Sequence, residues 1–226
     1  MNITLFDLIS PHYCSSCGEI GDVLCEHCKY DIIDEPYALC IVCRHIVAGA
    51  TNLCNGCDVP FRAAWCIGER QGSLRKILDN YKFSRQRAAH KVCASLLDNR
   101  IPILPEQIRI TYVSTTPPDI RRRGYDHAEL IARQFARLRG LSVEKTIDRT
   151  VNRRQLGAAK RQRIENAAAS IYVTKALPAV PYLLIDDIYT TGATINRASQ
   201  QLLAAGASEV YVAIIARQPL EKTSHI

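Results

Sequence analysis

The sequence contains no long apolar run. None of its hydrophobic stretches approaches the ~20 consecutive apolar residues that a membrane-spanning helix needs, so membrane insertion is not expected. The N-terminus, MNITLFDLIS, has no basic stretch ahead of an apolar one, which argues against a secretory signal. Both absences favour a cytoplasmic protein.

Basic residues are scarce in the first part of the chain. Residues 1–60 contain 2 Lys or Arg and 8 Asp or Glu, whereas the remainder contains 27 and 14. Between Arg121 and Arg163, 13 basic residues accompany 4 acidic ones. Such a density indicates contact with phosphates or a nucleic-acid backbone, although a solvated basic helix face gives the same pattern. Any contact with DNA is therefore expected on the second part, not on the acidic first part.

Cysteine is concentrated near the N-terminus, where eight of the ten cysteines form four Cys-x-x-Cys pairs. Disulfides are disfavoured without a secretory signal, because the cytosol keeps thiols reduced. Thiolates at this spacing are typical ligands of tetrahedral zinc. We therefore expect structural zinc bound by Cys14, Cys17, Cys25, Cys28, Cys40, Cys43, Cys54 and Cys57.

The pairing of these cysteines stays open at this point. Seven and ten residues separate the pairs that follow each other, which is short for a zinc ribbon, so sequential and interleaved arrangements both remain. A catalytic zinc is disfavoured because all-cysteine sites are normally closed to substrate. Redox activity is a weaker alternative, since such motifs usually occur singly near a βαβ unit. The unpaired Cys66 and Cys93 are expected to be small buried apolar residues.

The composition divides the chain near residue 60. Residues 1–60 have few apolar periods, so a metal would supply much of the stability of this zinc-ribbon module. Residues 61–226 alternate predicted strands and helices. Helices are expected over 71–83, 88–98 and about 126–139, and strands over 109–114, 170–173, 182–186 and 209–216. Continuous apolar strands in this alternation predict an α/β domain with a parallel sheet covered on both faces.

The segment YLLIDDIYTTGAT, residues 182–194, is the most informative. A strand ends in Asp186 and Asp187, and ligands of open α/β sheets bind at the carboxyl ends of strands. A Thr- and Gly-rich loop and a helix follow, and the N–H groups and dipole of a helix N-terminus suit a phosphate. Two carboxylates suit the hydroxyls of a ribose or a hydrated magnesium ion. A simple helix cap explains shorter fragments of the string but not the whole.

This string resembles the signature of the type I phosphoribosyltransferases. The resemblance implies that Asp186 and Asp187 hold the ribose hydroxyls of 5-phosphoribosyl-1-pyrophosphate, which binds with Mg²⁺. It also implies a loop around the 5-phosphate, formed by Thr190, Thr191, Gly192, Ala193 and Thr194. Tyr189 is expected to pack or to line the pocket.

Cys pairs ahead of such a domain resemble the competence-associated ComF family. The stretch RRRGYDH, residues 121–127, is similar to the RRRGFNQ of that family, and Gln155, Arg161, Arg163 and Asn166 match its Q…R.R..N spacing. The sequence departs from the family at Asp126 and His127, where Asn and Gln are commoner. We expect His127 to make structural hydrogen bonds and not to be catalytic.

Two further groups are candidates for contacts with pyrophosphate or DNA. Arg121, Arg122 and Arg123 lie between a strand and a helix and could grip phosphates with their guanidinium forks, or could be solvated charges. Ser114 and Thr115 follow the 109–114 strand at its carboxyl end, although Pro117–Pro118 could make this segment a simple turn.

The resemblance implies a function in natural competence, the uptake of transforming DNA. Three interpretations stay open. The chain is an active or ancestral phosphoribosyltransferase, or a regulator in which bound ribose phosphate is sensed or merely structural. The third is a non-catalytic accessory factor that binds single-stranded DNA or a partner. The family works with a helicase-like partner, which the acidic zinc module is expected to contact, and the sequence contains no recognisable site for an acceptor base.

Overall fold

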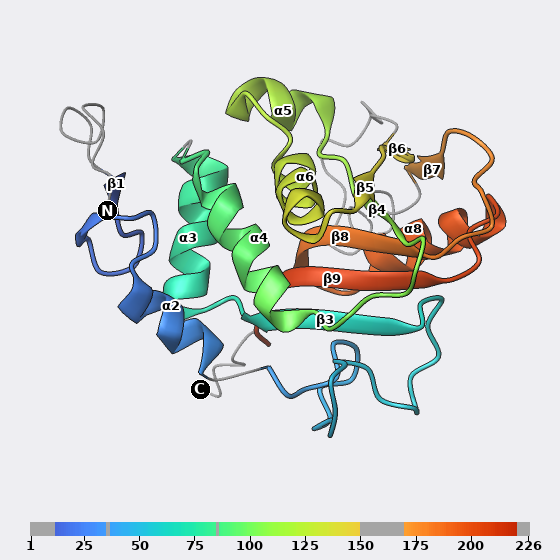
Figure 1. Ribbon diagram of the computed structural model, residues 1–226, viewed down its shortest axis with the longest axis horizontal. Coiled ribbons are helices and arrows are strands. Elements are labelled where there is room, and N and C mark those ends of the chain that lie inside the picture. Colours follow the sequence, from blue (N-terminus) through green and yellow to red (C-terminus); the bar gives the residue numbers. More distant parts are fainter. Residues whose placement is uncertain (1–11, 35–36, 85, 150–169, 221–226) are drawn as a thin grey trace, which may run out of the picture.

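The computed structural model describes residues 12–34, 37–84, 86–149 and 170–220 (Figure 1). Four residues that matched the ComF spacing, Gln155, Arg161, Arg163 and Asn166, therefore lie outside the described residues, as do Arg153 and Arg154 of the basic stretch.

A five-stranded parallel sheet forms the centre of the molecule, in the order β3-β9-β8-β4-β5. The strands are β3 (Ala63–Glu69), β4 (Arg109–Tyr112), β5 (Ser142–Val143), β8 (Tyr182–Tyr189) and β9 (Val210–Arg217). The continuous apolar sequence of β8 and β9 follows from this position, because both faces of a central parallel strand are buried. The predicted α/β fold with a parallel sheet is confirmed.

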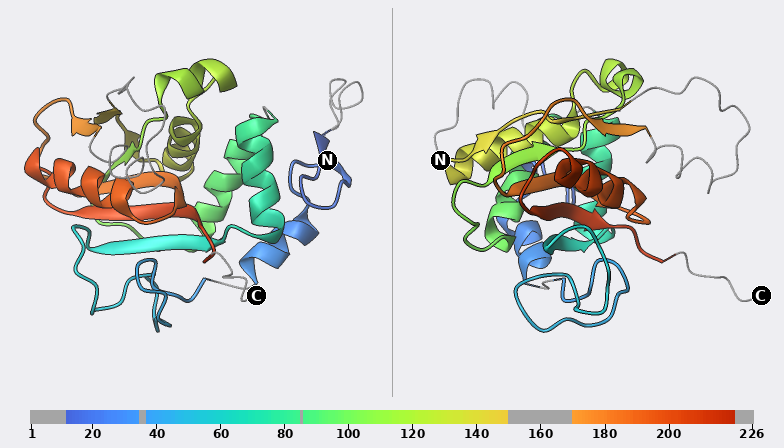
Figure 2. Two further views of the ribbon diagram at one scale, coloured as in Figure 1. Left: turned by 180° about the vertical axis from the view of Figure 1, so that it is seen from behind. Right: turned by 90° about the vertical axis from the view of Figure 1, so that its right-hand side faces the viewer.

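Helices cover both faces of the sheet (Figures 1 and 2). Helices α3 (Gly72–Phe83), α4 (Ala89–Arg100) and α6 (His127–Arg139) share one hydrophobic core with Leu183 and Ile185 of β8. Helix α8 (Ala193–Ala204) packs on the other face, in a core that contains Leu184 of the same strand. Successive residues of a strand point to opposite faces, so the run at the start of β8 supplies both cores.

Smaller elements complete the structure. An antiparallel pair, β6 (Ile147–Arg149) and β7 (Ile171–Val173), and a short helix, α5 (Pro117–Arg123), lie near the end of the sheet where β4 and β8 finish. The expectation of a turn at Pro117–Pro118 is wrong, since both prolines stand in the first turn of α5. Proline fits there because the first N–H groups of a helix have no intrahelical partner.

Two other boundaries differ from the sequence analysis. Strand β8 does not end at Asp186 but continues to Tyr189, because Ile188 and Tyr189 pair with β9. Strand β3 was not expected at all. It is an edge strand that pairs with β9 alone among the described residues, and its sequence AAWCIGE has little β-branched character.

The two Cys-rich segments pack on different sides of the sheet. The first begins with β1 (His12–Tyr13) and β2 (Ile20–Gly21), continues into α2 (Glu26–Ile33), and lies beside α3 (Figure 1). Its Leu24 belongs to the core of α3, α4 and α6, whereas Ile41 of the second segment belongs to the core of α8.

The division of the chain at residue 60 stays a prediction. No helix in the described part of the chain is long and apolar enough to cross a membrane.

Candidate functional site

The strand order changes direction between β4 and β8. From β4 the chain moves outward to β5, and from β8 it moves the other way to β9, so the carboxyl ends of β4 and β8 form a topological switch point. The last β4–β8 pair is Tyr112 with Ile185, followed by a hydrogen bond from the Val113 N–H to the Ile185 carbonyl of 3.1 Å. In the described part of the chain, Asp186 therefore starts a stretch of β8 that β4 does not cover. Ligands of open α/β sheets bind at such a point.

A cleft of about 410 Å³ opens there. Its walls come from the end of α3, the loop after β4, α5, the start of α6, β6 and β8. Seven of the residues proposed from the sequence line it: Ser114, Thr115, Arg123, Asp186, Asp187, Thr190 and Thr194. Arg121 and Arg122 are exposed on α5, where Arg122 forms an ion pair with Asp119. The structure thus brings the acids and most of the hydroxyl groups together, but only one arginine of the three.

Asp187 is the ionised member of the acid pair. Its side chain is buried, and its Oδ2 forms an ion pair with the Lys82 ammonium and lies 3.0 Å from Nε2 of His127. Burial alone would raise its pKa, but Lys82 and His127 hold the pKa of Asp187 well below the usual value of 3.8. Asp187 is therefore a carboxylate at neutral pH.

Asp186 has the opposite character. Its Oδ1 accepts a hydrogen bond of 2.9 Å from the backbone N–H of Asp187. Burial first, and then the adjacent charge of Asp187, raises the pKa of the Asp186 carboxyl to about 7. Two neighbouring acids with separated pKa values can take different parts at one site, one as a fixed charge and the other as a group that gains or loses a proton near neutral pH.

His127 and Asp126 organise the loop after β4. Asp126 caps the N-terminus of α6, and its carboxylate also accepts hydrogen bonds from the Thr115 N–H (2.9 Å) and the Thr115 hydroxyl (3.0 Å). Arg123 lies 3.0 Å from Nδ1 of His127 and can only donate, which places the imidazole proton on Nε2, toward Asp187. The two positions that depart from the ComF pattern therefore link the loop after β4 to the acid pair.

The Thr- and Gly-rich turn is tighter than expected. Only Thr190, Thr191 and Gly192 separate β8 from α8, so Ala193 and Thr194 already belong to the first turn of the helix. Gly192 has a φ of 81°, a conformation that favours glycine. The N-cap residue Gly192 has no side chain to cap the helix, and the Thr191 hydroxyl accepts a hydrogen bond of 3.4 Å from the Ala193 N–H. The N–H groups that follow in the first turn of α8 suit an anion.

Tyr189 lies underneath this turn. It is 2% exposed and does not line the cleft. A Cβ atom added to Gly192 would stand 2.1 Å from the Tyr189 hydroxyl oxygen. Of the two roles expected for Tyr189, packing is therefore correct. Gly192 is required because its backbone lies against the phenol, and not only for close approach of a ligand.

The side chains of the cleft that sequence reasoning missed include Lys82, Phe83 and Arg149. Lys82 and Phe83 are the last residues of α3, and Phe83 is 61% exposed with the Arg123 guanidinium 6.0 Å from its ring centroid. No local motif marks them. They reach the site because α3 ends at the carboxyl edge of the sheet, which only the folded arrangement reveals.

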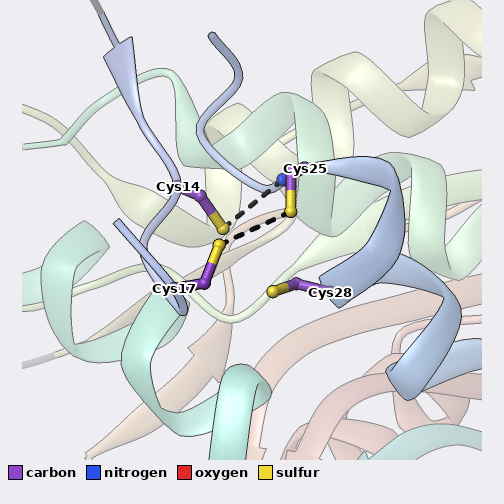
Figure 3. Close-up of side chains that lie close together, drawn as sticks. All are labelled: Cys14, Cys17, Cys25 and Cys28. Carbon is purple, nitrogen blue, oxygen red and sulfur yellow. Dashed lines mark hydrogen bonds between the residues drawn. The ribbon is translucent and has the colours of Figure 1, made fainter. Parts of the chain in front are cut away.

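The first Cys cluster has the geometry of a metal site (Figure 3). The sulfur atoms of Cys14, Cys17, Cys25 and Cys28 lie within 4.8 Å of one another. Cys17 and Cys25 are 3.7 Å apart, close to the ~3.8 Å between sulfurs around a tetrahedral zinc with Zn–S bonds of about 2.3 Å. The Cys25 N–H also donates to the Cys14 sulfur, at 3.4 Å.

The second cluster is similar and settles the pairing. Cys40, Cys43, Cys54 and Cys57 again lie within 4.8 Å of one another. The Sγ atoms of Cys40 and Cys57 are 3.9 Å apart, and those of Cys43 and Cys54 are 3.5 Å apart. The arrangement is thus sequential and not interleaved, and both four-cysteine clusters are compatible with structural zinc. Cys66 and Cys93 are fully buried, as predicted.

No family model matches the chain. Solved structures with a partial likeness include the allosteric regulatory enzyme of purine biosynthesis (TM-score 0.42, 20% identity, 61% of this chain). Orotate phosphoribosyltransferase from Aeropyrum pernix gives a TM-score of 0.36 and 16% identity over 63% of this chain. The chain spans 30% of the first of these proteins and 64% of the second.

Curated relatives match over more of the length. Competence protein F of Haemophilus influenzae is 27% identical and is matched over 90% of its length. The DNA utilization protein YhgH of Salmonella typhi is 24% identical, matched over 96%, and competence protein ComFC of Streptococcus pneumoniae is 25% identical, matched over 84%. Each covers 86% or 87% of this chain. The chain is therefore similar along most of its length to competence and DNA utilization proteins, which confirms its resemblance to the ComF family.

Proposed function

We propose that the cleft binds 5-phosphoribosyl-1-pyrophosphate, or a related ribose 5-phosphate, together with Mg²⁺, and that the chain acts in natural competence, in the uptake of transforming DNA. One observation carries the ligand: Asp186 and Asp187 lie on β8 beyond the end of β4, with the N-terminus of α8 only a few residues further on. A ribose with hydroxyls on C2 and C3 and a phosphate on C5 offers donors to the acid pair and an anion to the helix N-terminus.

The two acids take different parts in this proposal. One oxygen of Asp187 is already bound to Lys82 and His127, so Asp187 fixes the charge and shape of the site. Asp186 has the capacity to accept hydrogen bonds from the ribose hydroxyls. The 5-phosphate would bind the N–H groups and hydroxyls of the Thr190–Thr194 turn.

The pyrophosphate would face the loop after β4. Ser114 and Thr115 are both buried at the cleft wall, and the side chains of Arg123 and Arg149 supply positive charge there. Magnesium would neutralise part of the charge of a leaving pyrophosphate. If transfer from C1 of the ribose occurs, these residues contribute mainly position and electrostatic stabilisation.

A series of ligands that differ in their phosphate groups and in the 2-hydroxyl tests the proposal on the unaltered protein. Calorimetric titrations would compare 5-phosphoribosyl-1-pyrophosphate, ribose 5-phosphate, 2-deoxyribose 5-phosphate and pyrophosphate, each with magnesium. We expect the complete ligand to bind most tightly and the 2-deoxy sugar to bind more weakly than ribose 5-phosphate. Equal affinities for the two sugars would contradict recognition of the hydroxyls by the acid pair.

The second candidate is a non-catalytic factor that binds single-stranded DNA or a partner. The exposed ring of Phe83, with Arg123 beside it at the cleft, favours it, because bases stack on exposed aromatic rings next to basic side chains. Affinity for an oligonucleotide should fall steeply with salt and fall further in Phe83→Ala, by ~1–3 kcal/mol per stacked base. Phe83→Tyr, which keeps a ring, is the matched control.

The remaining parts of the proposal concern organisation. Residues 1–60 form the zinc module and 61–226 the ligand-binding domain. The acidic module would contact a helicase-like partner protein, whereas DNA would meet the basic residues 121–123. A cytoplasmic location fits thiols that must stay reduced to hold zinc.

A further inference from the structure

The second Cys cluster lies directly behind the turn of the cleft. We call residues 40–44, which include Cys40 and Cys43, the second knuckle. Ile41, between these two cysteines, is fully buried in the same hydrophobic core as Tyr189 of β8 and Ile195 of α8. The knuckle therefore contributes to the same core as both elements that the Thr190–Gly192 turn connects.

Arg217 joins the knuckle to the strand beneath the turn. It is the last residue of β9 and is 5% exposed. Its guanidinium donates hydrogen bonds to the carbonyl oxygens of Ile41, at 2.5 Å, and of Val42, at 2.8 Å. The same guanidinium lies over the Tyr189 ring, 5.5 Å from its centroid. One buried side chain thus contacts the Cys-x-x-Cys backbone on one side and the support of the turn on the other.

Two contacts continue from Tyr189 to the cleft. Its hydroxyl stands under Gly192, where an added Cβ would be 2.1 Å away. Its carbonyl accepts a hydrogen bond of 2.8 Å from the N–H of Gln218, a residue that lines the cleft. Arg44 of the second knuckle donates to the Gln218 carbonyl and forms an ion pair with Glu69. The knuckle is therefore bound to the cleft by a side-chain route and by a backbone route.

We propose that metal in the second Cys cluster holds the turn in its ligand-binding shape through the positioning residues Arg217 and Tyr189. The carbonyls of Ile41 and Val42 lie within the loop that Cys40 and Cys43 close when both bind one zinc ion. Losing that ion would release the acceptors of Arg217 and loosen the support of Gly192. Because coupling between two sites is reciprocal, ligand in the cleft must in turn retain zinc in this cluster, with an effect on the order of tenfold.

The inference rests on the proposed ligand, and the unaltered, zinc-loaded chain tests it. A chromogenic chelator would withdraw zinc with and without 5-phosphoribosyl-1-pyrophosphate and magnesium. We expect the zinc of the second cluster to be released about tenfold more slowly when the ligand is present. The zinc of the first cluster should be released at an unchanged rate. The first cluster is the internal control, because it packs on the face of α3, and chelation of zinc by the ligand would affect both clusters.

Two variants test the route. Arg217→Lys keeps the charge but loses the planar fork that reaches both carbonyls, so the ligand should no longer slow zinc release. Arg62→Lys is the matched control, because the Arg62 side chain is 68% exposed and pairs with Glu209 at the surface. If Arg217→Lys fails to fold, the release rates of the unaltered protein and of Tyr189→Leu decide the question.

The outcomes separate the two claims. Ligand that binds in calorimetry but protects neither zinc, or protects both equally, overturns the coupling and leaves the proposed function intact. Full protection in Arg217→Lys overturns the role of Arg217. Failure of the ligand to bind the unaltered protein overturns the proposed function instead.

Discussion

Lys82, the penultimate residue of α3, forms a buried ion pair with Asp187 of β8. The Lys82 side chain is 14% exposed and that of Asp187 is 8% exposed, so water screens the pair poorly. Because His127 binds the same carboxylate oxygen, three elements of the fold meet at one charge. The cleft is thus built around a fixed negative charge before any ligand enters.

Removing Lys82 should be costly. In Lys82→Met the Asp187 carboxylate loses its buried ammonium partner, and breaking a buried pair on one side costs ~3–5 kcal/mol. Urea unfolding at neutral pH should show this loss, whereas the exposed Lys91→Met should change stability by about 0.5 kcal/mol or less. A loss as small for Lys82→Met as for Lys91→Met would contradict the account of the charge.

The charge of Asp187 also sets an acid limit. Because its folded-state pKa lies below 3.8, it stabilises the fold above that pH, and this contribution is lost as the pH falls below it through the folded-state pKa. Lys82→Met should therefore lose less stability than the unaltered protein over this acidic range. Unfolding free energies from pH 6 down to pH 3 would measure the difference.

Ligand binding should depend on the proton of Asp186. Its pKa of about 7 means that the population of the carboxylate form increases as the pH rises through neutrality. This form accepts hydrogen bonds from a sugar. Below that pKa the association constant for ribose 5-phosphate should fall by up to about tenfold per pH unit. Asp186→Asn has no such proton and reports the titration of the sugar phosphate alone. Identical pH profiles for the two proteins would exclude the proposed role of Asp186.

The same residue predicts a change in stability. A carboxyl whose folded-state pKa is raised contributes stability below pH 3.8, and that contribution is lost as the pH rises through about 7. Relative to the unaltered protein, Asp186→Asn should therefore be more stable at pH 8 than at pH 5. Thermal unfolding at the two pH values measures this, and a constant difference would argue against the raised pKa.

Zinc content should follow the two clusters. The purified chain should hold about two zinc ions, in line with the two four-cysteine groups, and Cys43→Ser should hold about one. Cys93→Ala, which alters a buried cysteine outside both groups, should keep both. Atomic emission on protein purified under reducing conditions gives the numbers. A Cys93→Ala protein that lost zinc would show that the assignment of ligands is wrong.

Gly192 should be sensitive in two ways. Gly192→Ala places a β-carbon at a φ of 81° and into the Tyr189 phenol. Gly140→Ala is the matched control, because Gly140 has a φ of 64° with no described atom within 4 Å of an added Cβ. Gly140→Ala should cost the ~1–2 kcal/mol of left-handed backbone, and Gly192→Ala should cost more and also weaken ligand binding. Equal effects of the two variants on stability and on ligand binding would contradict a role of the Gly192 turn in the site.

The sequence predicted the parallel sheet, helices over 71–83 and about 126–139, and the eight cysteines that form the two clusters, although it left their pairing open. These features depend on local periodicity and spacing, which a single chain displays directly. The sequence did not predict the edge strand β3. Its pairing partner is β9, which lies more than a hundred residues further along the chain. Sequence reasoning also treated Pro117–Pro118 as a turn, because the helix that they begin is too short to show a period.

The site was predicted in part for the same reason. Asp186, Asp187 and the TTGAT turn form one continuous motif and lie together. Lys82, Arg149 and Arg217 belong to no motif, and their roles arise only from the contacts between α3, β6, β9 and β8. The shared carboxylate of Asp187 is a tertiary contact, and no residue next to it in sequence announces Lys82 as its partner.

The most direct test of the account is a calorimetric titration of 5-phosphoribosyl-1-pyrophosphate with magnesium into the zinc-loaded protein and into Asp186→Asn. Asp186 is the better position to change, because Asp187→Asn would leave Lys82 buried without its partner. The account predicts saturable binding at one site per chain, weakened at least tenfold in the variant. No binding by the folded protein, or equal binding by both, would contradict it.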